Sequence, residues 1–473
     1  YTVKDTLSLH DALPIWLAAE GMRFTDAHSS SAVCTPSRYS ILTGRNCWKT
    51  RLKEWVIGGF GRPLIQEDDS TLPKVLKSAG YDAYAVGKWH LGFEWTDKNG
   101  QTLTGDQADA MDRAGFDVDY TRPLGGGPIG AGFDRFYGIS GSLDMPPYCY
   151  IENDRVTNTE LTEKQLYYNQ QRTGLQAQDF EESQVDITFA GKAVEYIEAH
   201  RRERPERPFF LYLATASPHR PCDIAPELAR GQSQAGDRGD MVVLFDWVVG
   251  KVLETLDTLG IEEETLVVVT SDNGGRLTCA NGRDYGHKTN GIFRGQKADI
   301  WDGGHRIPFI VRWPGKARPG SECPRLIGLT DFIETAGEIV GHEPQCAHED
   351  SASFLSLLQK PLAPATREYI VHHSGGGFFA IRDKRFKLVM ATGSGGFSKP
   401  YGEKLRTFDP ERCILYDLEN DIGETANVLK SHPEEALRLY QILLEEAGSE
   451  NLQYRAGKPL RTGSSPMQIG AEH

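Results

Sequence analysis

The sequence predicts an α/β fold in which a mainly parallel central sheet is flanked by helices, followed by a smaller C-terminal α+β subdomain. Continuous apolar runs at 209–213, 265–269 and 309–311 are typical of strands buried on both faces of a sheet. Between the first two runs, residues 240–259 carry apolar side chains at helical spacing. Strands that alternate with helices imply a parallel sheet, whose ligands gather at the carboxyl ends of the strands.

Two segments in the first third of the chain contain or adjoin glycines: one predicts a helix, and the other resembles a nucleotide-binding motif that we reject. Residues 71–79 are predicted to form a helix, because Ser70 can cap it, Pro73 fits its first turn and Gly80 can end it. The run 125–130 formally matches the dinucleotide-binding fingerprint, but no strand precedes it and Pro128 interrupts the expected helix. We therefore exclude a nucleotide role for that run.

The pattern changes after a proline-containing loop at 361–364. Residues 378–382 and 385–390 alternate apolar and polar side chains around a short turn, which predicts a hairpin, and 414–418 predicts a further strand. Residues 433–446 predict an amphipathic helix through Leu437, Tyr440, Leu443 and Leu444. We expect residues 16–360 to form the larger domain and 361–473 the subdomain, with an antiparallel sheet and a packed helix.

Composition excludes several classes of protein. The 473 residues carry a net charge of −14, which argues against nucleic acid as a partner because phosphate binding needs a basic face. No apolar run reaches the roughly 20 residues that a membrane-spanning helix needs. The eight cysteines lack the paired spacing of a zinc site, and they leave the disulfide pairing undetermined.

The segment 34–45 is the most informative part of the chain. Cys34 is followed by Pro36, which fits a first helical turn, so Cys34 should lie at a helix N-terminus where negative charge is favoured. Arg38 comes one turn later and can fold back toward the cysteine. An isolated motif of this kind is more often a buried structural cysteine. The whole segment, however, resembles the signature of type I sulfatases, in which this cysteine is oxidised to formylglycine.

Further segments resemble the same family in the family's order. They are 80–81 with 87–92 (the second signature), 208–219 (a central strand and the sulfate-site histidine), 270–274 (the metal-binding strand end), 294–309 (a basic loop and the next strand) and 415–425 (the C-terminal segment). The resemblance runs from about residue 17 into the 420s. It implies an alkaline-phosphatase-like fold, makes 16–360 the catalytic domain, and implies hydrolysis of sulfate esters by S–O cleavage.

The resemblance also implies a role for each matching residue. Sulfate esters hydrolyse extremely slowly unaided, so the site must supply a nucleophile, charge stabilisation and a proton for the leaving group. By resemblance, the hydrated aldehyde derived from Cys34 attacks sulfur, and its second hydroxyl later expels sulfate. The remaining roles are hydrate binding by Arg38, hydrate and sulfate binding by Lys88 and His90, general acid catalysis by His219, sulfate binding by Lys297, substrate contact by Ser142 and His287, and Ca²⁺ or Mg²⁺ binding by Asp272 and Asn273.

The N-terminus departs from the family pattern. Residues 1–15 have no family counterpart, and relatives place a first strand there that ends in two adjacent metal-binding aspartates. We expect 1–15 to be a non-native segment on an N-terminally truncated domain, and we expect weakened metal binding as a result. The resemblance further implies a formylglycine-generating or sulfatase-maturating enzyme as a partner, and a periplasmic or secreted location whose signal peptide was lost with the N-terminus.

Two alternatives to a sulfatase remain open. One is a phosphate or phosphonate ester hydrolase of the same superfamily, although Lys88, His90 and Lys297 together favour sulfate. The other is a metal-deficient, inactive relative that binds sulfated glycans. Tryptophans 48, 55 and 95, with the segment 142–148, predict aromatic walls near the pocket. We expect the substrate to be a sulfated sugar, such as an amino-sugar or galactose unit.

Overall fold

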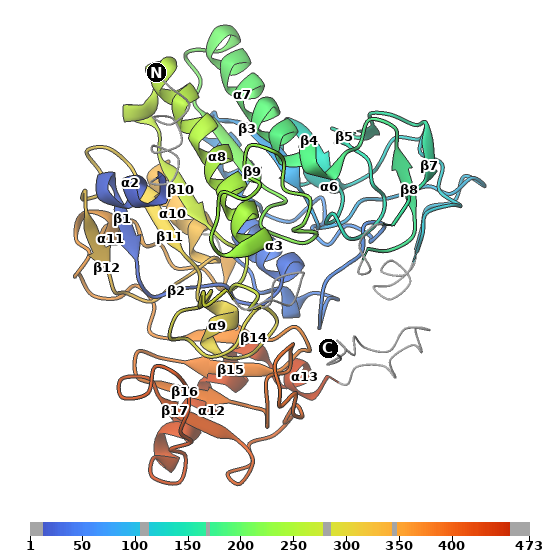
Figure 1. The fold of residues 1–473 in the computed structure, drawn as a ribbon. Helices are drawn as coiled ribbons and strands as arrows, with labels where there is room; N and C mark the ends of the chain where they lie inside the picture. The colour runs from blue at the N-terminus through green and yellow to red at the C-terminus, as the bar shows by residue number, and fades with distance from the viewer. Residues whose placement is uncertain (1–12, 105–112, 167–170, 278–284, 343–347, 455–473) are drawn as a thin grey trace.

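A computed structural model describes residues 13–104, 113–166, 171–277, 285–342 and 348–454. Figure 1 shows a larger part, in which helices pack on β-sheets, and a smaller sheet formed by the C-terminal quarter of the chain. The α/β class predicted from the sequence is confirmed. Over the described ranges, no helix has the length and apolar character needed to cross a membrane. Residues 1–12 of the predicted non-native segment 1–15 lie outside the described residues.

One mixed sheet carries three parallel strands at its centre. β3 (Asp82–Lys88) pairs in parallel with β4 (Arg135–Ile139) on one side and with β9 (Phe209–Ala214) on the other. β5 (Ile151–Glu152) and β6 (Arg155–Val156) extend it beyond β4 in antiparallel fashion. The carboxyl ends of β3 and β9 therefore meet at one edge, where Lys88 lies.

A second mixed sheet contains β10, the strand that precedes Asp272. β10 (Val267–Thr270) pairs antiparallel with β11 (Phe309–Arg312), which pairs antiparallel with β1 (Met22–Phe24). β12 (Ser321–Cys323) completes it, parallel to β1. Two short ladders lie apart from these sheets: β2 (Ala27–His28) with β13 (Ile327–Gly328), and β7 (Leu161–Glu163) with β8 (Leu175–Ala177).

The expected burial of the three apolar runs is correct for only one of them. β11 is fully buried, whereas every residue of β9 and β10 is only partly buried. The reason is topological: within the described residues, β9 pairs only with β3 and β10 only with β11, so each ends its sheet. Their apolar side chains pack on α8 (Gly236–Thr258), in a cluster that also includes residues of α7 (Val185–Glu203).

The predicted helices form with small corrections. The periodic run 240–259 lies within α8, and the predicted run 71–79 corresponds to α4 (Leu72–Ser78). Thr71, rather than Ser70, occupies the cap position of α4, because the Ser70 hydroxyl is hydrogen-bonded to His348. The other helices of the larger part are α2 (Leu13–Glu20), α3 (Cys34–Thr43), α6 (Gly127–Gly130), α9 (Asp302–His305), α10 (Asp331–Ile339) and α11 (Leu355–Gln359), with 3-10 turns η1 (Cys47–Lys49), η2 (Glu182–Gln184) and η3 (Glu262–Glu264).

The C-terminal sheet contains the predicted hairpin and third strand, together with one strand that was not predicted. β14 (Ile370–His373), β15 (Phe379–Arg382), β16 (Phe386–Val389) and β17 (Ile414–Asp417) are consecutive antiparallel neighbours. α12 (Pro433–Ala447) packs on them through buried Leu439 and Leu443, and α13 (Ser449–Gln453) follows it. Leu437 was predicted to face this core, but it is 47% exposed, because the buried stripe runs through Ala436, Leu439 and Leu443 instead.

A buried ion-pair cluster joins this sheet to the larger part of the molecule. Lys387 of β16 lies 2.9 Å from a carboxylate oxygen of Asp302 at the start of α9, and 2.8 Å from one of Glu424. The other oxygen of the Glu424 carboxylate accepts a hydrogen bond from the Asp302 backbone N–H at 2.7 Å. All three side chains are fully buried. We call this arrangement the Lys387 clasp.

Replacing Lys387 with methionine should therefore destabilise the protein strongly. The variant leaves the buried Glu424 carboxylate without its ammonium partner, which typically costs about 3–5 kcal/mol, whereas Asp302 keeps Arg306 and Arg382. Lys384→Met, in the exposed turn between β15 and β16, is the matched control and should change stability by less than about 0.5 kcal/mol. Guanidinium unfolding curves of both variants provide the measurement, and equal midpoints would contradict the assignment of the clasp as a stabilising element.

Candidate functional site

The candidate site forms where the ends of several elements meet. Cys34 is the first residue of α3, and Lys88 is the last residue of β3. Asp272 and Asn273 lie just after β10, beyond Ser271, and Lys297 lies in the loop before α9. Pro36 occupies the first turn of α3, as predicted, so no backbone donor is lost there. The chain thus brings residues far apart in sequence to one place.

Cys34 lies beside a cation. Its side chain is buried, and Lys297 Nζ donates a hydrogen bond to Cys34 Sγ at 3.1 Å. Asn273 Oδ1 lies 3.8 Å from the same sulfur. Burial by itself would raise the pKa of the Cys34 thiol, but Lys297 and Lys88 hold that pKa below its ordinary value. The site therefore stabilises negative charge at the position of this sulfur.

Arg38 connects three parts of the site. Its Nε donates a hydrogen bond to Asp272 Oδ2 at 3.0 Å, and its Nη1 donates to the backbone carbonyl of Lys88 at 2.7 Å. Burial tends to raise the pKa of the Asp272 carboxyl, but Arg38, Lys88 and Lys297 hold that pKa below its usual range. Arg38 thus links α3 to the ends of β3 and β10. It acts on Cys34 through its charge, whereas its hydrogen bonds go to Asp272 and Lys88.

Lys88 and His90 line the same site from the end of β3. Burial lowers the pKa of Lys88, while the Cys34 thiolate opposes this shift. Burial, together with Lys88 and Arg38, holds the pKa of His90 well below its ordinary value, so the ring is neutral. His90 Nε2 donates to the carbonyl of Ile57 at 2.8 Å, and its buried Nδ1 has no hydrogen-bond partner among the described residues. That nitrogen is available to accept a hydrogen bond from a bound hydroxyl group.

His219 follows β9 and lies near a carboxylate that the sequence did not single out. His219 Nδ1 donates a hydrogen bond to the backbone carbonyl of Arg220 at 2.9 Å and lies 4.0 Å from Asp144 Oδ1. Ser142 donates to that same carboxylate oxygen at 2.6 Å. Burial, then Lys297 and Lys88, hold the pKa of His219 well below its ordinary value, which shows that it shares the electrostatic environment of Cys34.

The other predicted substrate-contact residue, His287, shows no such connection to the site. His287 is exposed, and within the described ranges no hydrogen bond or ion pair joins it to Cys34, Lys88 or Lys297. Sequence reasoning missed Asp144 and Arg220, which pair at 2.8 Å beside His219. The available signal was that Asp144 lies two residues after Ser142 and Arg220 directly follows His219.

Of the three predicted aromatic walls, two belong to the core. Trp48 and Trp95 are each 1% exposed. Their indole rings pack against core aromatic residues, Trp48 on Phe379 and Trp95 on Phe60, which explains the burial. Trp55 is partly exposed and stacks on Phe397 at 5.8 Å between ring centroids. Only Trp55 therefore remains a candidate for a pocket wall.

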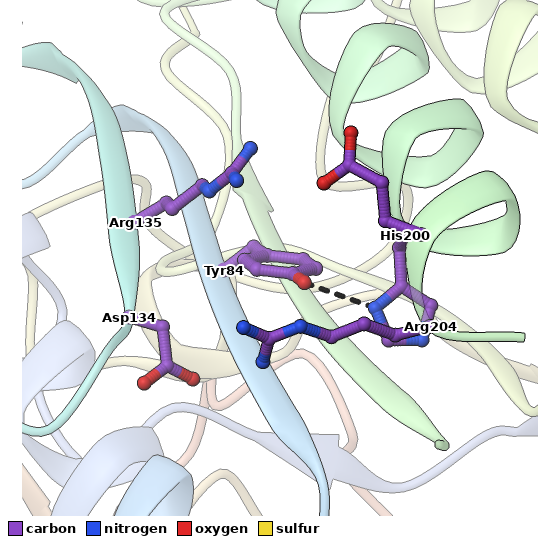
Figure 2. A pocket seen from close by; sticks show the side chains of 6 residues that line it. Tyr84, Asp134, Arg135, His200 and Arg204 are labelled. Carbon is purple, nitrogen blue, oxygen red and sulfur yellow. Dashed lines mark hydrogen bonds between the residues drawn. The ribbon is translucent and has the colours of Figure 1, made fainter. Parts of the chain in front are cut away.

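A separate pocket lies at the opposite end of β3. Figure 2 shows Tyr84, Asp134, Arg135, His200 and Arg204 around a cavity of about 170 Å³. The Tyr84 hydroxyl bonds to His200 Nδ1 at 2.9 Å, and Arg204 pairs with buried Asp82 at 3.0 Å. Apart from the Tyr84–His200 hydrogen bond, the polar lining groups pair with residues beside the pocket, such as Asp134 with Lys77 at 2.6 Å. None of the lining residues belongs to the Cys34 site.

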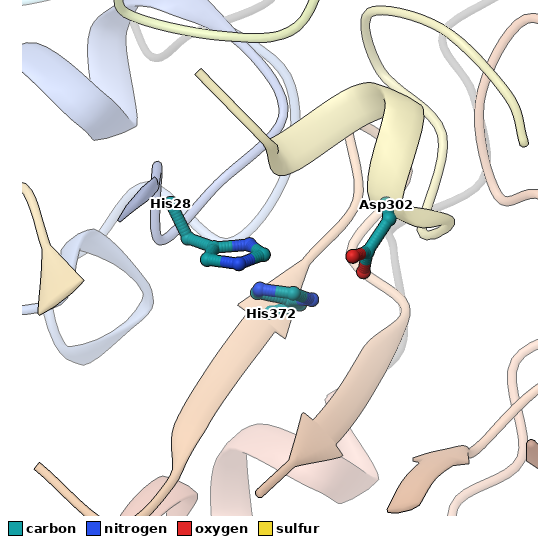
Figure 3. Close-up of side chains that lie close together, drawn as sticks. All are labelled: His28, Asp302 and His372. Atoms are coloured by element: carbon teal, nitrogen blue, oxygen red, sulfur yellow. The ribbon is translucent and has the colours of Figure 1, made fainter. Parts of the chain in front are cut away.

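Two histidines and an aspartate gather beside the Lys387 clasp. Figure 3 shows His28, Asp302 and His372 close together, and all three are buried. A cation would find little free charge there, because the oxygens of Asp302 already pair with Lys387, Arg306 and Arg382 at 2.9, 3.0 and 3.3 Å. Three positive groups around one carboxylate make this an ion-pair network rather than a metal site.

The predicted metal ligands do not complete a Ca²⁺ or Mg²⁺ site in the described part of the chain. Asp272 and Asn273 supply two oxygen-bearing side chains, and one carboxylate oxygen of Asp272 already accepts a hydrogen bond from Arg38 Nε and forms an ion pair with Arg38 Nη2. Ca²⁺ takes about 6–8 oxygen ligands. Among the described residues, the one group of three potential ligands is the His28 cluster, which does not include Asp272. The residues present therefore do not fit a resident divalent cation.

Calorimetric titration of this chain with Ca²⁺ should accordingly show weak binding. With two side-chain ligands and a competing arginine, we expect a Kd weaker than micromolar, whereas the tightest complete protein sites reach roughly 10⁻⁹–10⁻⁷ M. Asp272→Asn should leave the heat signal almost unchanged. A micromolar or tighter Kd that Asp272→Asn abolishes would overturn the conclusion that the ligand set is incomplete.

Comparison with known proteins gives concordant matches. The family model described as "Sulfatase" matches residues 13–342. An N-acetylgalactosamine-6-O-sulfatase of Bacteroides thetaiotaomicron is 30% identical over 90% of this chain and 86% of its own length. A solved chain from a study of glycosaminoglycan metabolism by Bacteroides thetaiotaomicron superposes with a TM-score of 0.78 at 27% identity, over 91% of this chain and 93% of that one.

A more distant structure shares the fold alone. The phosphonate monoester hydrolase SpPMH from Silicibacter pomeroyi has a TM-score of 0.55 and 19% identity, over 92% of this chain and 90% of that one. The same architecture therefore also occurs in a hydrolase whose name refers to another ester class. The discrimination between ester classes must come from the site residues and not from the fold.

Proposed function

The chain belongs to the sulfatase family, and we propose that it hydrolyses a sulfate ester of a carbohydrate at the site around Cys34. It is a sulfuric ester hydrolase by family. The observation that carries the proposed site is the contact of Lys297 with Cys34 Sγ at 3.1 Å, with Lys88 acting on the same sulfur. Two cations converge on the atom that the family converts into its nucleophile.

Formylglycine derived from Cys34 would supply, once formed, a hydroxyl nucleophile in place of a thiolate. The chain's own residues suit that replacement. Lys297 and Lys88 would stabilise an oxyanion where they now stabilise a thiolate, because both act by charge. The free Nδ1 of His90 would accept a hydrogen bond from a hydroxyl group at this position. A partner enzyme that oxidises Cys34 is therefore part of the proposal.

The remaining site residues would neutralise charge on the sulfate ester, hold the site in place or protonate the leaving group. Lys297 and Lys88 would neutralise the sulfate oxygens as negative charge builds up in the transition state. Arg38 would hold the end of β3 and Asp272 in place through its hydrogen bonds. His219 would donate a proton from Nε2 to the leaving oxygen, because its Nδ1–H is already directed to the Arg220 carbonyl. Asp272 and Asn273 supply only two of the oxygen-bearing side chains that a divalent cation would need, so no step is assigned to such an ion.

A sulfated amino sugar is the substrate class we propose to test first. The support is the name of the Bacteroides thetaiotaomicron relative, an N-acetylgalactosamine-6-O-sulfatase at 30% identity. Trp55, partly exposed and stacked on Phe397, offers an aromatic surface that suits a sugar ring. Bacterial relatives of this kind support a periplasmic or secreted location.

Turnover of paired substrates tests the ester class. We expect the matured protein to hydrolyse 4-nitrophenyl sulfate, and N-acetylgalactosamine 6-sulfate in preference to its phosphate counterpart. Mass spectrometry of the peptide that carries Cys34 should show the formyl product after co-expression with a maturating enzyme. Faster hydrolysis of aryl phosphate would favour the phosphoester alternative. An unmodified cysteine with retained binding of sulfated glycans would favour a non-catalytic binding protein.

A further inference from the structure

The carboxylate of Asp144 is the most buried charged group beside His219. Its side chain is 2% exposed, although the segment around it is a loop. Three partners hold it: Ser142 at 2.6 Å on Oδ1, Arg220 at 2.8 Å on Oδ2, and Arg172 at 3.7 Å on Oδ2. Burial raises the pKa of this carboxyl, but Arg220, His219 and Arg172 more than offset the effect, so it is ionised. This loop thus keeps a negative charge at a fixed position.

Asp144 is also the one carboxylate among the charged groups that act most strongly on His219. Lys297, Lys88 and Arg220 all disfavour a proton on the imidazole ring, and Asp144 alone among them favours it. The negative charge of Asp144 lies on the Nδ1 side of the ring, whereas the proton for the leaving group would be on Nε2. Asp144 Oδ1 lies 4.0 Å from His219 Nδ1, which also donates to the Arg220 carbonyl, so neither contact uses Nε2.

A general acid at this position faces an electrostatic problem. The lysines that suit a sulfate group make an imidazolium ring unfavourable beside them. A bound sulfate monoester would neutralise part of the lysine charge, but Arg220 directly follows His219 in the chain, and its positive charge also disfavours a proton on the ring. Without Asp144, the Arg220 guanidinium would lose the carboxylate that pairs with it at 2.8 Å. A protonated His219 ring therefore needs a nearby negative charge to stabilise it.

We propose that Asp144 is a positioning residue for His219, which fixes the imidazole through its Nδ1 side and supplies the countercharge that allows Nε2 to carry the proton for the leaving group. Ser142 and Arg172 hold Asp144 in place, and Arg220 is the charge that Asp144 must offset. Ser142 then acts on catalysis through Asp144. The inference rests on the proposed function, since the leaving group is that of the sulfate ester.

The substrates separate this role from a merely structural one. Nitrophenolate leaves without a proton, whereas a sugar alkoxide does not. Asp144→Asn should therefore lower kcat for N-acetylgalactosamine 6-sulfate by about 10–100-fold and change kcat for 4-nitrophenyl sulfate by less than about 3-fold. The falling limb of the pH profile should move to lower pH by about one unit or more. Asp223→Asn, an exposed carboxylate four residues beyond His219, is the control.

A second variant tests the electrostatic origin of the effect. If Asp144 acts by offsetting Arg220, then Arg220→Met in the Asp144→Asn background should return the falling limb partway to its original position. Equal loss on both substrates, with an unmoved pH profile and no effect of Arg220→Met, would overturn the proposal. That pattern would show that Asp144 only supports the loop.

A measurement without turnover keeps this test separate from that of the proposed function. Histidine-selective ¹³C labelling, with the His219 signal identified from His219→Gln, gives the pKa of His219 in 5–50 mM inorganic sulfate. Asp144→Asn should lower that pKa relative to wild type and to Asp223→Asn. An unchanged pKa would refute the inference even if sulfate esters are hydrolysed. A lowered pKa in a protein that hydrolyses no sulfate ester would support the coupling and count against the proposed function.

Discussion

Cys34→Ala is expected to abolish sulfate-ester hydrolysis in the matured protein, with kcat lower by at least about 10⁴-fold. The variant removes the side chain that becomes the nucleophile, and covalent catalysis cannot be replaced by the neighbouring lysines. Losses of this size are typical when the nucleophile of a covalent enzyme is removed. Steady-state rates on 4-nitrophenyl sulfate provide the measurement.

Cys47→Ala is the matched control for this variant. Cys47 is also buried, but burial raises the pKa of its thiol to about 12, so it has no ionised form to offer. Its replacement should leave kcat within about 3-fold, with at most a small loss of stability from the removed sulfur. A Cys34→Ala protein as fast as wild type would end the assignment of this site, whatever the family.

Lys297→Met should have the second largest effect, a fall in kcat of about 10²–10³-fold. The ammonium lies 3.1 Å from Cys34 Sγ, in a site where burial amplifies its charge. Methionine keeps most of the side-chain length while it removes the charge. Lys288→Met, on the exposed part of the preceding loop, is the control and should be close to wild type.

The chain without oxidised Cys34 provides an independent measurement for the same variant. Lys297 lowers the pKa of the Cys34 thiol, so its removal should raise that pKa and slow alkylation by iodoacetamide at pH 7–8. The rate is read on the peptide that carries Cys34. Among the other described cysteines, burial raises the pKa of the thiols of Cys47, Cys149, Cys323 and Cys413, which disfavours their alkylation. An alkylation rate unchanged in Lys297→Met would show that this ammonium does not control the charge at position 34.

The elements predicted best from the sequence were those whose pattern is local. The helical repeat at 240–259 and the alternation at 378–390 depend on neighbouring residues, and both elements form. The burial of 209–213 and 265–269 was overestimated, because a run of apolar residues does not show how many neighbours a strand has. That number is fixed by pairing between distant segments, which the sequence pattern does not contain.

Site residues that lie in family motifs could be predicted from the sequence. Asp144, whose role depends on the charges around it, could not. The structure places Cys34, Arg38, Lys88 and Lys297 together, as the motif order implied. Asp144 was missed, because a single aspartate in a loop has no recognisable pattern until its partners are known. Trp48 and Trp95 were wrongly predicted to line the pocket, because tryptophan packs equally well in a core.

The Lys387 clasp bears on how this protein could be shortened or recombined. Glu424 holds the backbone of Asp302 at the start of α9, and the next residues of α9 bind the site loops: Gly303 N–H donates to the Arg294 carbonyl at 2.7 Å, and Gly304 accepts from Gly274 at 2.9 Å. Hydrogen bonds at consecutive residues of α9 thus link the C-terminal quarter to Gly274, the neighbour of Asn273, and to Arg294, in the loop that carries Lys297. A fragment cut near residue 360, or a chimera with a foreign C-terminal sheet, would lose the anchor of these hydrogen bonds. Domain-swapping strategies for this protein should therefore exchange α9 and its C-terminal partners together.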